Sequence, residues 1–158
     1  MKINHFINNQ GFTLIEMMIT ITLLVFILFI GSSLTRSWID QSQVNSAINT
    51  LQDAISQTKA IAIRNTNNTT MQEASASMCI YDKSIKIVYG ICPSLEPSNA
   101  IQSFSIASGI TIKQGNDPLH CMDFNYVGAL VPASSCSTTS TPTLTIGKNN
   151  ETAEIVIR

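Results

Sequence analysis

An unbroken apolar segment near the start of the chain limits what it can fold into more than any other feature. Only one of the 23 residues from Phe12 to Leu34 is charged, and that residue is Glu16. As a helix with a rise of about 1.5 Å per residue, the segment would be about 35 Å long, enough to cross the apolar core of a bilayer with some tilt. The sequence therefore predicts a membrane-spanning helix over residues 12–34.

A cleaved secretory signal peptide is the alternative interpretation of this segment. It would need a shorter apolar region and a cleavage site of the Ala-x-Ala type after it. Here the small residues Gly31, Ser32 and Ser33 lead directly into a further helical pattern. The pattern therefore favours a membrane helix.

The first eleven residues form a short polar leader. They contain Lys2 and His5 but no acidic residue. By the positive-inside tendency, such a leader stays in the cytoplasm, so the chain beyond Leu34 is expected on the outer side of the membrane. The bias is small, because Lys2 and the amino terminus carry nearly all of it.

The acid inside the apolar segment needs an explanation. A lone carboxylate in a bilayer-embedded helix costs about 2.5 to 3.5 kcal/mol on insertion scales, and such residues are usually functional. We therefore expect Glu16 to find a cationic partner.

Beyond the span, the apolar pattern becomes one-sided, with apolar residues at steps of three, four or seven and polar residues between them. This pattern predicts an amphipathic helix over residues 35–65 that continues the membrane helix. The polar cluster NTNNTT from Asn65 to Thr70 ends it. The apolar positions are Leu34, Trp38, Val44, Ile48, Leu51, Ile55 and Ala62.

From Met71 onward, short β-type segments alternate with turn residues, which is typical of an antiparallel sheet. The last segment alternates Ile155 and Ile157 with more polar neighbours, so we expect one of its faces on the stem helix and the other mostly in solvent. Turns are expected at 82–83, 108–109, 127–128 and 147–150. The predicted strands are 77–81, 84–89, 101–107, 111–113, 121–125, 129–131, 143–146 and 153–158. The fold class predicted from these patterns is α+β.

The residues at the start of the apolar segment, GFTLIE at positions 11–16, resemble the prepilin-peptidase site of type IV pilins and type II secretion pseudopilins. The resemblance implies cleavage after Gly11 and N-methylation of Phe12. It also implies that Glu16 meets the N-terminal amine of a neighbouring subunit in a filament. A pilin-like fold, with a long N-terminal helix packed on an antiparallel sheet, is the corresponding expectation.

A weaker similarity extends into the head. The helix end KAIAIRN at 59–65, the Cys79 strand and the segment FNYVG at 124–128 resemble the minor pilins and minor pseudopilins typified by FimT, FimU and GspH. One departure matters. DNA-binding members carry a Gly-Arg-x-Arg stretch near the C-terminus, whereas this chain ends TAEIVIR.

All four cysteines lie in the part predicted to be outside the cytoplasm, where an even count indicates two disulfides. Three connectivities are possible, and we favour the sequence-local pairs Cys79–Cys92 and Cys121–Cys136. A tight turn at 82–83 would set Cys79 far from Cys92, so the first bond is expected to need a bulge or a looser register. A zinc site that includes His120 is the alternative, and the absence of a C-x-x-C pair disfavours it.

The sequence contains no catalytic constellation. His5 lies in the leader, and the only acids close to His120 are Asp117 and Asp123, which we interpret as loop and strand-surface acids. We therefore expect neither an enzyme nor a cofactor-binding protein.

Nucleic-acid binding requires a basic surface. From Asn65 onward, the chain has five basic and seven acidic residues, which disfavours DNA as the main partner. A local basic patch of Lys83, Lys86 and Lys148 is the alternative, and solvated surface lysines are the favoured interpretation.

Together, these features predict a leader (1–11), a transmembrane helix (12–34), a stem helix (35–65) and a β-rich head (66–158). The resemblance implies a minor pilin-like structural subunit in or priming a type IV pilus, with the helix in the inner membrane, the head in the periplasm, and prepilin peptidase and other pilins as partners. The alternatives are a minor pseudopilin of a type II secretion system and, less favoured, a DNA-binding pilin.

Overall fold

The computed structural model describes residues 12–131, 136 and 143–157, with no side-chain description for residues 31–34. The predicted leader with Gly11, and the last residue Arg158, lie outside the described residues. The chain forms two compact units, residues 1–36 and 37–158.

The first unit is the beginning of α1 (Leu14–Arg64), a helix of 51 residues. Every side chain from Phe12 to Ile30 is exposed, so its apolar surface is open on all sides. The hydroxyl groups of Thr20 and Thr22 donate to the helix carbonyls of Met17 and Met18, at 2.9 and 2.7 Å, which satisfies these polar groups without water. By length and composition, α1 can cross a membrane.

The rest of α1 buries one stripe of side chains in the second unit. The buried positions are three or four residues apart, which places them on one face of the helix. Thr58 is the polar member, and its hydroxyl donates to the Ala54 carbonyl at 2.6 Å. The stripe consists of Val44, Ala47, Leu51, Ala54, Ile55, Thr58 and Ala62.

Local hydrogen bonds end the helix after Arg64. Asn65 adopts a left-handed φ of 40°, and its side-chain oxygen accepts a bond of 2.8 Å from the Thr69 backbone N–H. The Ser75 hydroxyl donates to the Ala62 carbonyl at 2.9 Å, which satisfies an acceptor of the last helical turn.

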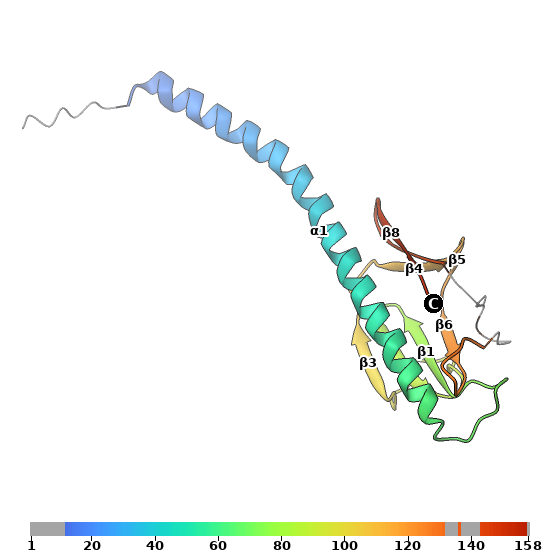
Figure 1. Cartoon of the computed structure of the whole chain (residues 1–158). Helices are drawn as coiled ribbons and strands as arrows, with labels where there is room; N and C mark the ends of the chain where they lie inside the picture. The colour runs from blue at the N-terminus through green and yellow to red at the C-terminus, as the bar shows by residue number, and fades with distance from the viewer. Residues whose placement is uncertain (1–11, 132–135, 137–142, 158) are drawn as a thin grey trace, which may run out of the picture. The chain divides into compact units, whose positions relative to one another are not determined.

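The described part of the head contains two four-stranded antiparallel sheets (Figure 1). The first has the order β3-β2-β1-β6 and the second the order β5-β4-β7-β8. The strands are β1 (Ala76–Tyr81), β2 (Ser84–Tyr89), β3 (Gln102–Ser105), β4 (Thr111–Gln114), β5 (Asp117–Pro118), β6 (Cys121–Phe124), β7 (Thr143–Lys148) and β8 (Glu151–Val156).

One hydrophobic core joins the stem stripe to both sheets. It contains Leu51 from α1, Met78 and Phe124 from the first sheet, and Leu144 and Ile146 from the second. The first sheet lies by the end of the stem, where Lys59 stands over the Phe124 ring at 5.8 Å, and the second lies by its beginning (Figure 1). The structure confirms the predicted α+β architecture of a long helix packed on antiparallel sheets.

The strand predictions need three corrections. Residues 129–131 form no strand, because the turn after Asn125 leaves only an isolated bridge from Leu130 to Phe124. Strand β5, which is only two residues long, was not predicted. Gly147 and Lys148 belong to β7 and not to a turn, since Lys148 pairs with Glu151 across a two-residue turn in which Asn149 has a φ of 53°.

The last strand alternates as predicted but begins earlier, at Glu151. Ile157 is buried and Ile155 packs on the core, whereas Glu154 and Val156 are exposed.

We predict that Leu51→Ala destabilises the head by about 2–5 kcal/mol, because it leaves a cavity at the centre of the stem stripe. The measurement is urea unfolding of a fragment spanning residues 37–158. The matched control, Gln52→Ala, alters the adjacent exposed position and should change the free energy of unfolding by about 0.5 kcal/mol or less. Equal effects of the two substitutions would contradict the described packing.

Candidate functional site

The predicted processing and assembly residues lie at the N-terminal end of α1. Phe12 is 79% exposed, just before the helix begins. Glu16 is in the first turn, and its backbone N–H is bonded to the Thr13 hydroxyl oxygen at 3.3 Å. Gly11 lies outside the described residues.

This geometry shows a helix cap by Thr13 that the sequence interpretation missed. Thr13 caps the helix, and Thr-x-x-Glu is the pattern of a capping box. A carboxylate in the first turn is also favoured by the partial positive charge of the helix N-terminus. The helix therefore places Glu16 one turn from Phe12, whose amine would be freed by cleavage after Gly11.

The cysteines of the head form two disulfides, Cys79–Cys92 and Cys121–Cys136, with Cα–Cα distances of 5.7 and 5.3 Å. These are the sequence-local pairs. The expectation that the first bond requires a bulge or a looser register is wrong. Strands β1 and β2 pair in regular register from Ala76–Tyr89 to Tyr81–Ser84.

The bond forms because the chain doubles back after β2. Gly90 makes the reversal with a φ of 73°, and its N–H donates to the Ser75 carbonyl at 3.1 Å. The returning loop is held to the hairpin beyond Cys92: the Tyr81 hydroxyl donates to the Pro93 carbonyl at 3.2 Å, and Lys86 pairs with Glu96 at 3.1 Å.

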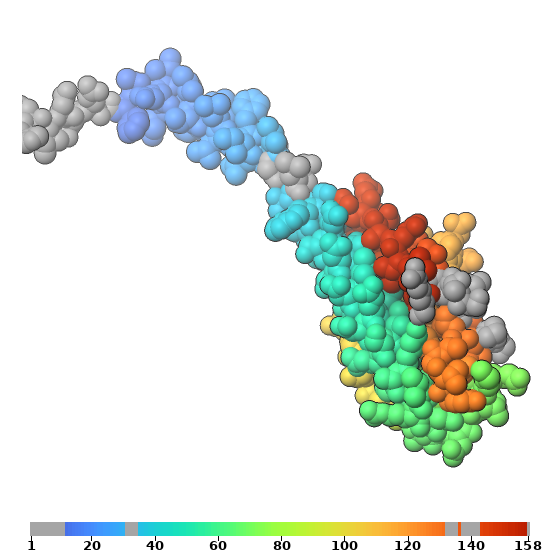
Figure 2. Space-filling view, viewed as in Figure 1, coloured from blue at the N-terminus to red at the C-terminus, as the bar shows by residue number. Residues whose placement is uncertain are grey.

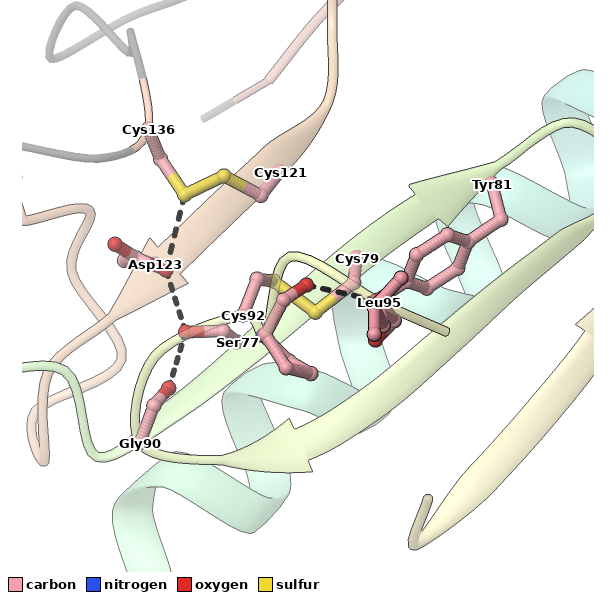
Figure 3. The surroundings of a disulfide bond; sticks show 10 residues. Ser77, Cys79, Tyr81, Gly90, Cys92, Leu95, Cys121, Asp123 and Cys136 are labelled. Carbon is pink, nitrogen blue, oxygen red and sulfur yellow. Dashed lines mark hydrogen bonds between the residues drawn. A yellow bond between two sulfur atoms is a disulfide. The ribbon is translucent and has the colours of Figure 1, made fainter. Parts of the chain in front are cut away.

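The face of the first sheet under this loop carries a buried acid. Asp123 is completely buried, so its interpretation as a strand-surface acid is wrong. One carboxyl oxygen lies 2.5 Å from the Ser77 hydroxyl and 3.3 Å from the sulfur of Cys136. The other oxygen has no hydrogen-bond partner among the described residues. Figure 3 shows Ser77 between Asp123 and Gly90, with the Cys121–Cys136 bond on the other side of Asp123.

The number of protons available to the hydrogen bonds of Asp123, Ser77 and Gly90 indicates that the Asp123 carboxyl is neutral. Ser77 also bonds to the Gly90 carbonyl, which can only accept. The single hydroxyl proton of Ser77 cannot be donated both to Gly90 and to an ionised Asp123. If Asp123 is protonated, it donates to Ser77, which then donates to Gly90, and both contacts are hydrogen bonds.

Electrostatics agree with this assignment. Burial raises the pKa of the Asp123 carboxyl above its ordinary value, and the hydrogen bond with Ser77 opposes this rise to a smaller extent. The acid is therefore a structural member of a buried polar network that ties β1, β6 and the start of the returning loop together.

The burial of Asp123 could have been predicted from its place in the sequence. Residues two apart in a strand share a face, so Asp123 lies on the same face as Cys121. A disulfide from Cys121 to a cysteine outside the strand implies that this face is covered.

The same region contains the only group of potential metal ligands found among the described residues: Cys92, Cys121, Cys136 and Asp123, whose ligand atoms lie within 4.8 Å of one another. Zinc binds cysteine as the thiolate, and these sulfurs are bonded in disulfides. His120, the candidate in the zinc alternative, is exposed and is not a member of this group.

The lysines proposed as a basic patch are largely engaged within the head. Lys86 pairs with Glu96 and donates to the Pro97 carbonyl at 2.8 Å. Lys148 lies 3.6 Å from Asp40 and bonds to Gln43. Both lysine side chains are less than one-fifth exposed, so neither presents a free charge for phosphate.

We predict that Asp123→Asn makes the head more stable at neutral pH. The pKa of Asp123 is raised in the folded state. Its contribution to the stability of the head is therefore fully present below the ordinary aspartate pKa of about 3.9, and it is lost as pH rises through the pKa of the folded state. An amide keeps a donor for Ser77 and does not ionise.

Urea midpoints of the 37–158 fragment at about pH 4 and about pH 7 measure this effect. The stability advantage of Asp123→Asn should grow as the pH rises. Asp117→Asn, at an exposed acid, is the control and should follow the unmodified chain at both pH values. An advantage that shrinks or stays constant with rising pH would show that Asp123 is not held neutral.

Comparison with known proteins identifies the N-terminal region. Residues 7–32 match the prokaryotic N-terminal methylation motif, which includes the predicted cleavage site, Glu16 and most of the apolar segment. No curated protein and no solved structure showed significant similarity to the chain. The motif is typical of type IV pilins and pseudopilins, and the exposed apolar start of α1 fits it. The chain therefore carries, at the start of a pilin-like α+β architecture, the N-terminal methylation motif that is typical of type IV pilins and pseudopilins.

Proposed function

We propose that the chain is a minor pilin-like structural subunit that enters, or primes, a filament rooted in the inner membrane, without catalytic turnover of its own. The observation that carries this proposal is the methylation motif at the start of one continuous helix. The beginning of that helix exposes apolar side chains on all sides, while its end is built into a folded head.

Such a helix suits a subunit that moves from lipid into a filament. In the bilayer, the exposed side chains of residues 12–30 contact acyl chains. In a filament, the same side chains can pack against the helices of neighbouring subunits, because protein and acyl chains are similarly apolar surroundings. Prepilin peptidase is the processing partner in this proposal, and the head lies in the periplasm before assembly.

The head contributes folded structure in this proposal, and DNA is not its partner. Acidic residues outnumber basic ones from Asn65 onward, and Lys86 and Lys148 are bonded within the head. Phosphate binding depends on cations that are free to displace counterions.

Deletion of the gene distinguishes a subunit of a type IV pilus from a subunit of a type II secretion system. Loss of surface pili with normal secretion supports a type IV pilus subunit. Loss of enzyme secretion with normal pili would instead assign the chain to a type II secretion pseudopilus.

The carboxylate of Glu16 provides the test of filament entry. In the proposed filament, it meets a Phe12 amine, and truncating one partner of a buried charge pair costs about 2–5 kcal/mol. We predict that Glu16→Ala lowers the amount of chain recovered with other filament subunits more than about tenfold, since each 1.4 kcal/mol is a factor of ten.

Thr20→Ala is the matched control, because Thr20 is an exposed polar residue one turn further along the same helix. Leader cleavage, membrane insertion and head folding should be normal in both variants. Undiminished recovery of Glu16→Ala in the filament fraction would show that the carboxylate is not an assembly contact.

A further inference from the structure

The tryptophan at the start of the stem is unusually exposed. Trp38 is the single tryptophan of the chain, and 76% of its surface is accessible. The neighbouring Ile39 is 45% exposed, and Arg36 is exposed as well. The buried stripe begins only at Val44, so Trp38 takes no part in the core of the head.

The position of Trp38 along α1 gives its expected depth in a bilayer. Trp38 follows Leu14, the first residue of α1, by 24 residues, which corresponds to about 36 Å of helix. The apolar core of a bilayer is about 30 Å thick, and the bilayer with its interfacial layers is about 40–45 Å thick. If the motif end lies at the cytoplasmic face, Trp38 therefore reaches the headgroup layer of the opposite face.

The chemistry of these side chains fits that layer. The indole ring is apolar but carries an N–H donor, and tryptophan is enriched at both membrane–water interfaces. The Arg36 guanidinium can donate to lipid phosphates, while its methylene groups stay on the apolar side.

The turns of the stem around Trp38 also bind the β7–β8 hairpin of the head. The Ser37 hydroxyl donates to the Glu151 carboxylate at 2.6 Å, and the Asn149 amide donates to Asp40 at 2.7 Å. These bonds fix the tip of the β7–β8 hairpin beside the start of the stem, where its red atoms adjoin the cyan helix in Figure 2. The hairpin turn, Asn149-Asn150, is polar, as a surface next to lipid headgroups requires.

We propose that Trp38, with Arg36 and Ile39, binds the phospholipid headgroup layer on the outer side of the membrane, and that this contact holds the β7–β8 turn at the membrane surface before assembly. The inference rests on the proposed membrane-anchored function. It assigns a lipid contact to a side chain that otherwise exposes a large apolar surface to water.

The test uses the fluorescence of the full chain in phosphatidylcholine–phosphatidylglycerol vesicles at a low protein-to-lipid ratio. Lipids with bromines near the glycerol end, in the middle or at the deep end of the acyl chains report the depth of the indole. The control chain carries Trp38→Phe and Gln52→Trp, which moves the tryptophan to an exposed position 14 residues, about 21 Å, further along the helix.

We expect Trp38 emission to be blue-shifted relative to the control and to lose most intensity with the shallow bromines. The control should be unaffected by any brominated lipid. Emission equal to that of the control, or the strongest quenching by the deep bromines, would overturn the inference. A blue shift that disappears on dilution with lipid would also overturn it, because a second copy of the chain would then be the partner.

Alkaline extraction of the same vesicles separates this inference from the function on which it rests. A chain retained in the vesicles with an unquenched Trp38 contradicts only the headgroup contact. A chain released from the vesicles contradicts the membrane anchor as well.

Discussion

The structure depends on the packing of one stripe of the stem helix against the head. The stripe from Val44 to Ala62 meets core residues from both sheets, and the two sheets share a core because they flank the same helix. Small residues, Ala47, Ala54 and Ala62, occupy nearly half of the stripe. Before residue 31, the same helix exposes apolar side chains on all sides, and Glu16 is its single charged residue. The beginning of α1 is thus suited to apolar surroundings on all sides, and its later part is suited to packing on the head. The boundary lies where the helix changes from apolar on all sides to apolar on one side.

The far face of the first sheet is stabilised differently, because α1, the helix of the described residues, packs on the opposite face. The Cys79–Cys92 disulfide holds the returning loop on this face, and the Cys121–Cys136 disulfide ties Cys136 to β6. The hydrogen bonds of Asp123, Ser77 and Gly90 link two strands to the returning loop. Each disulfide closes a short loop, with sequence separations of 13 and 15, which corresponds to about 3 kcal/mol in chain-entropy terms. A neutral carboxyl fits this face better than a charged one, since the second oxygen of Asp123 has no hydrogen-bond partner among the described residues.

The features that follow from periodicity or from neighbouring residues could be predicted from the sequence. The stem, its end at Asn65 and most strand positions are of this kind, because each depends on a local pattern of apolar and turn residues. The division into two sheets could not be predicted, since strand order depends on contacts between distant segments. The loop reversal at Gly90 was missed for the same reason, so the Cys79–Cys92 pair looked strained when only the hairpin was considered. At the candidate site, the motif identified Phe12 and Glu16, whereas the helix cap by Thr13 and the burial of Asp123 were overlooked although local signals for both were present.

The most direct test of the central claim is the intact mass of the chain purified from the membrane fraction without reductant. The account predicts a single species that begins at Phe12, carries one added methyl group and lacks four hydrogen atoms because of two disulfides. A chain that retains residues 1–11, or one cut after residues 31–33 as a secretory signal would be, would contradict the assignment as a processed pilin-like subunit.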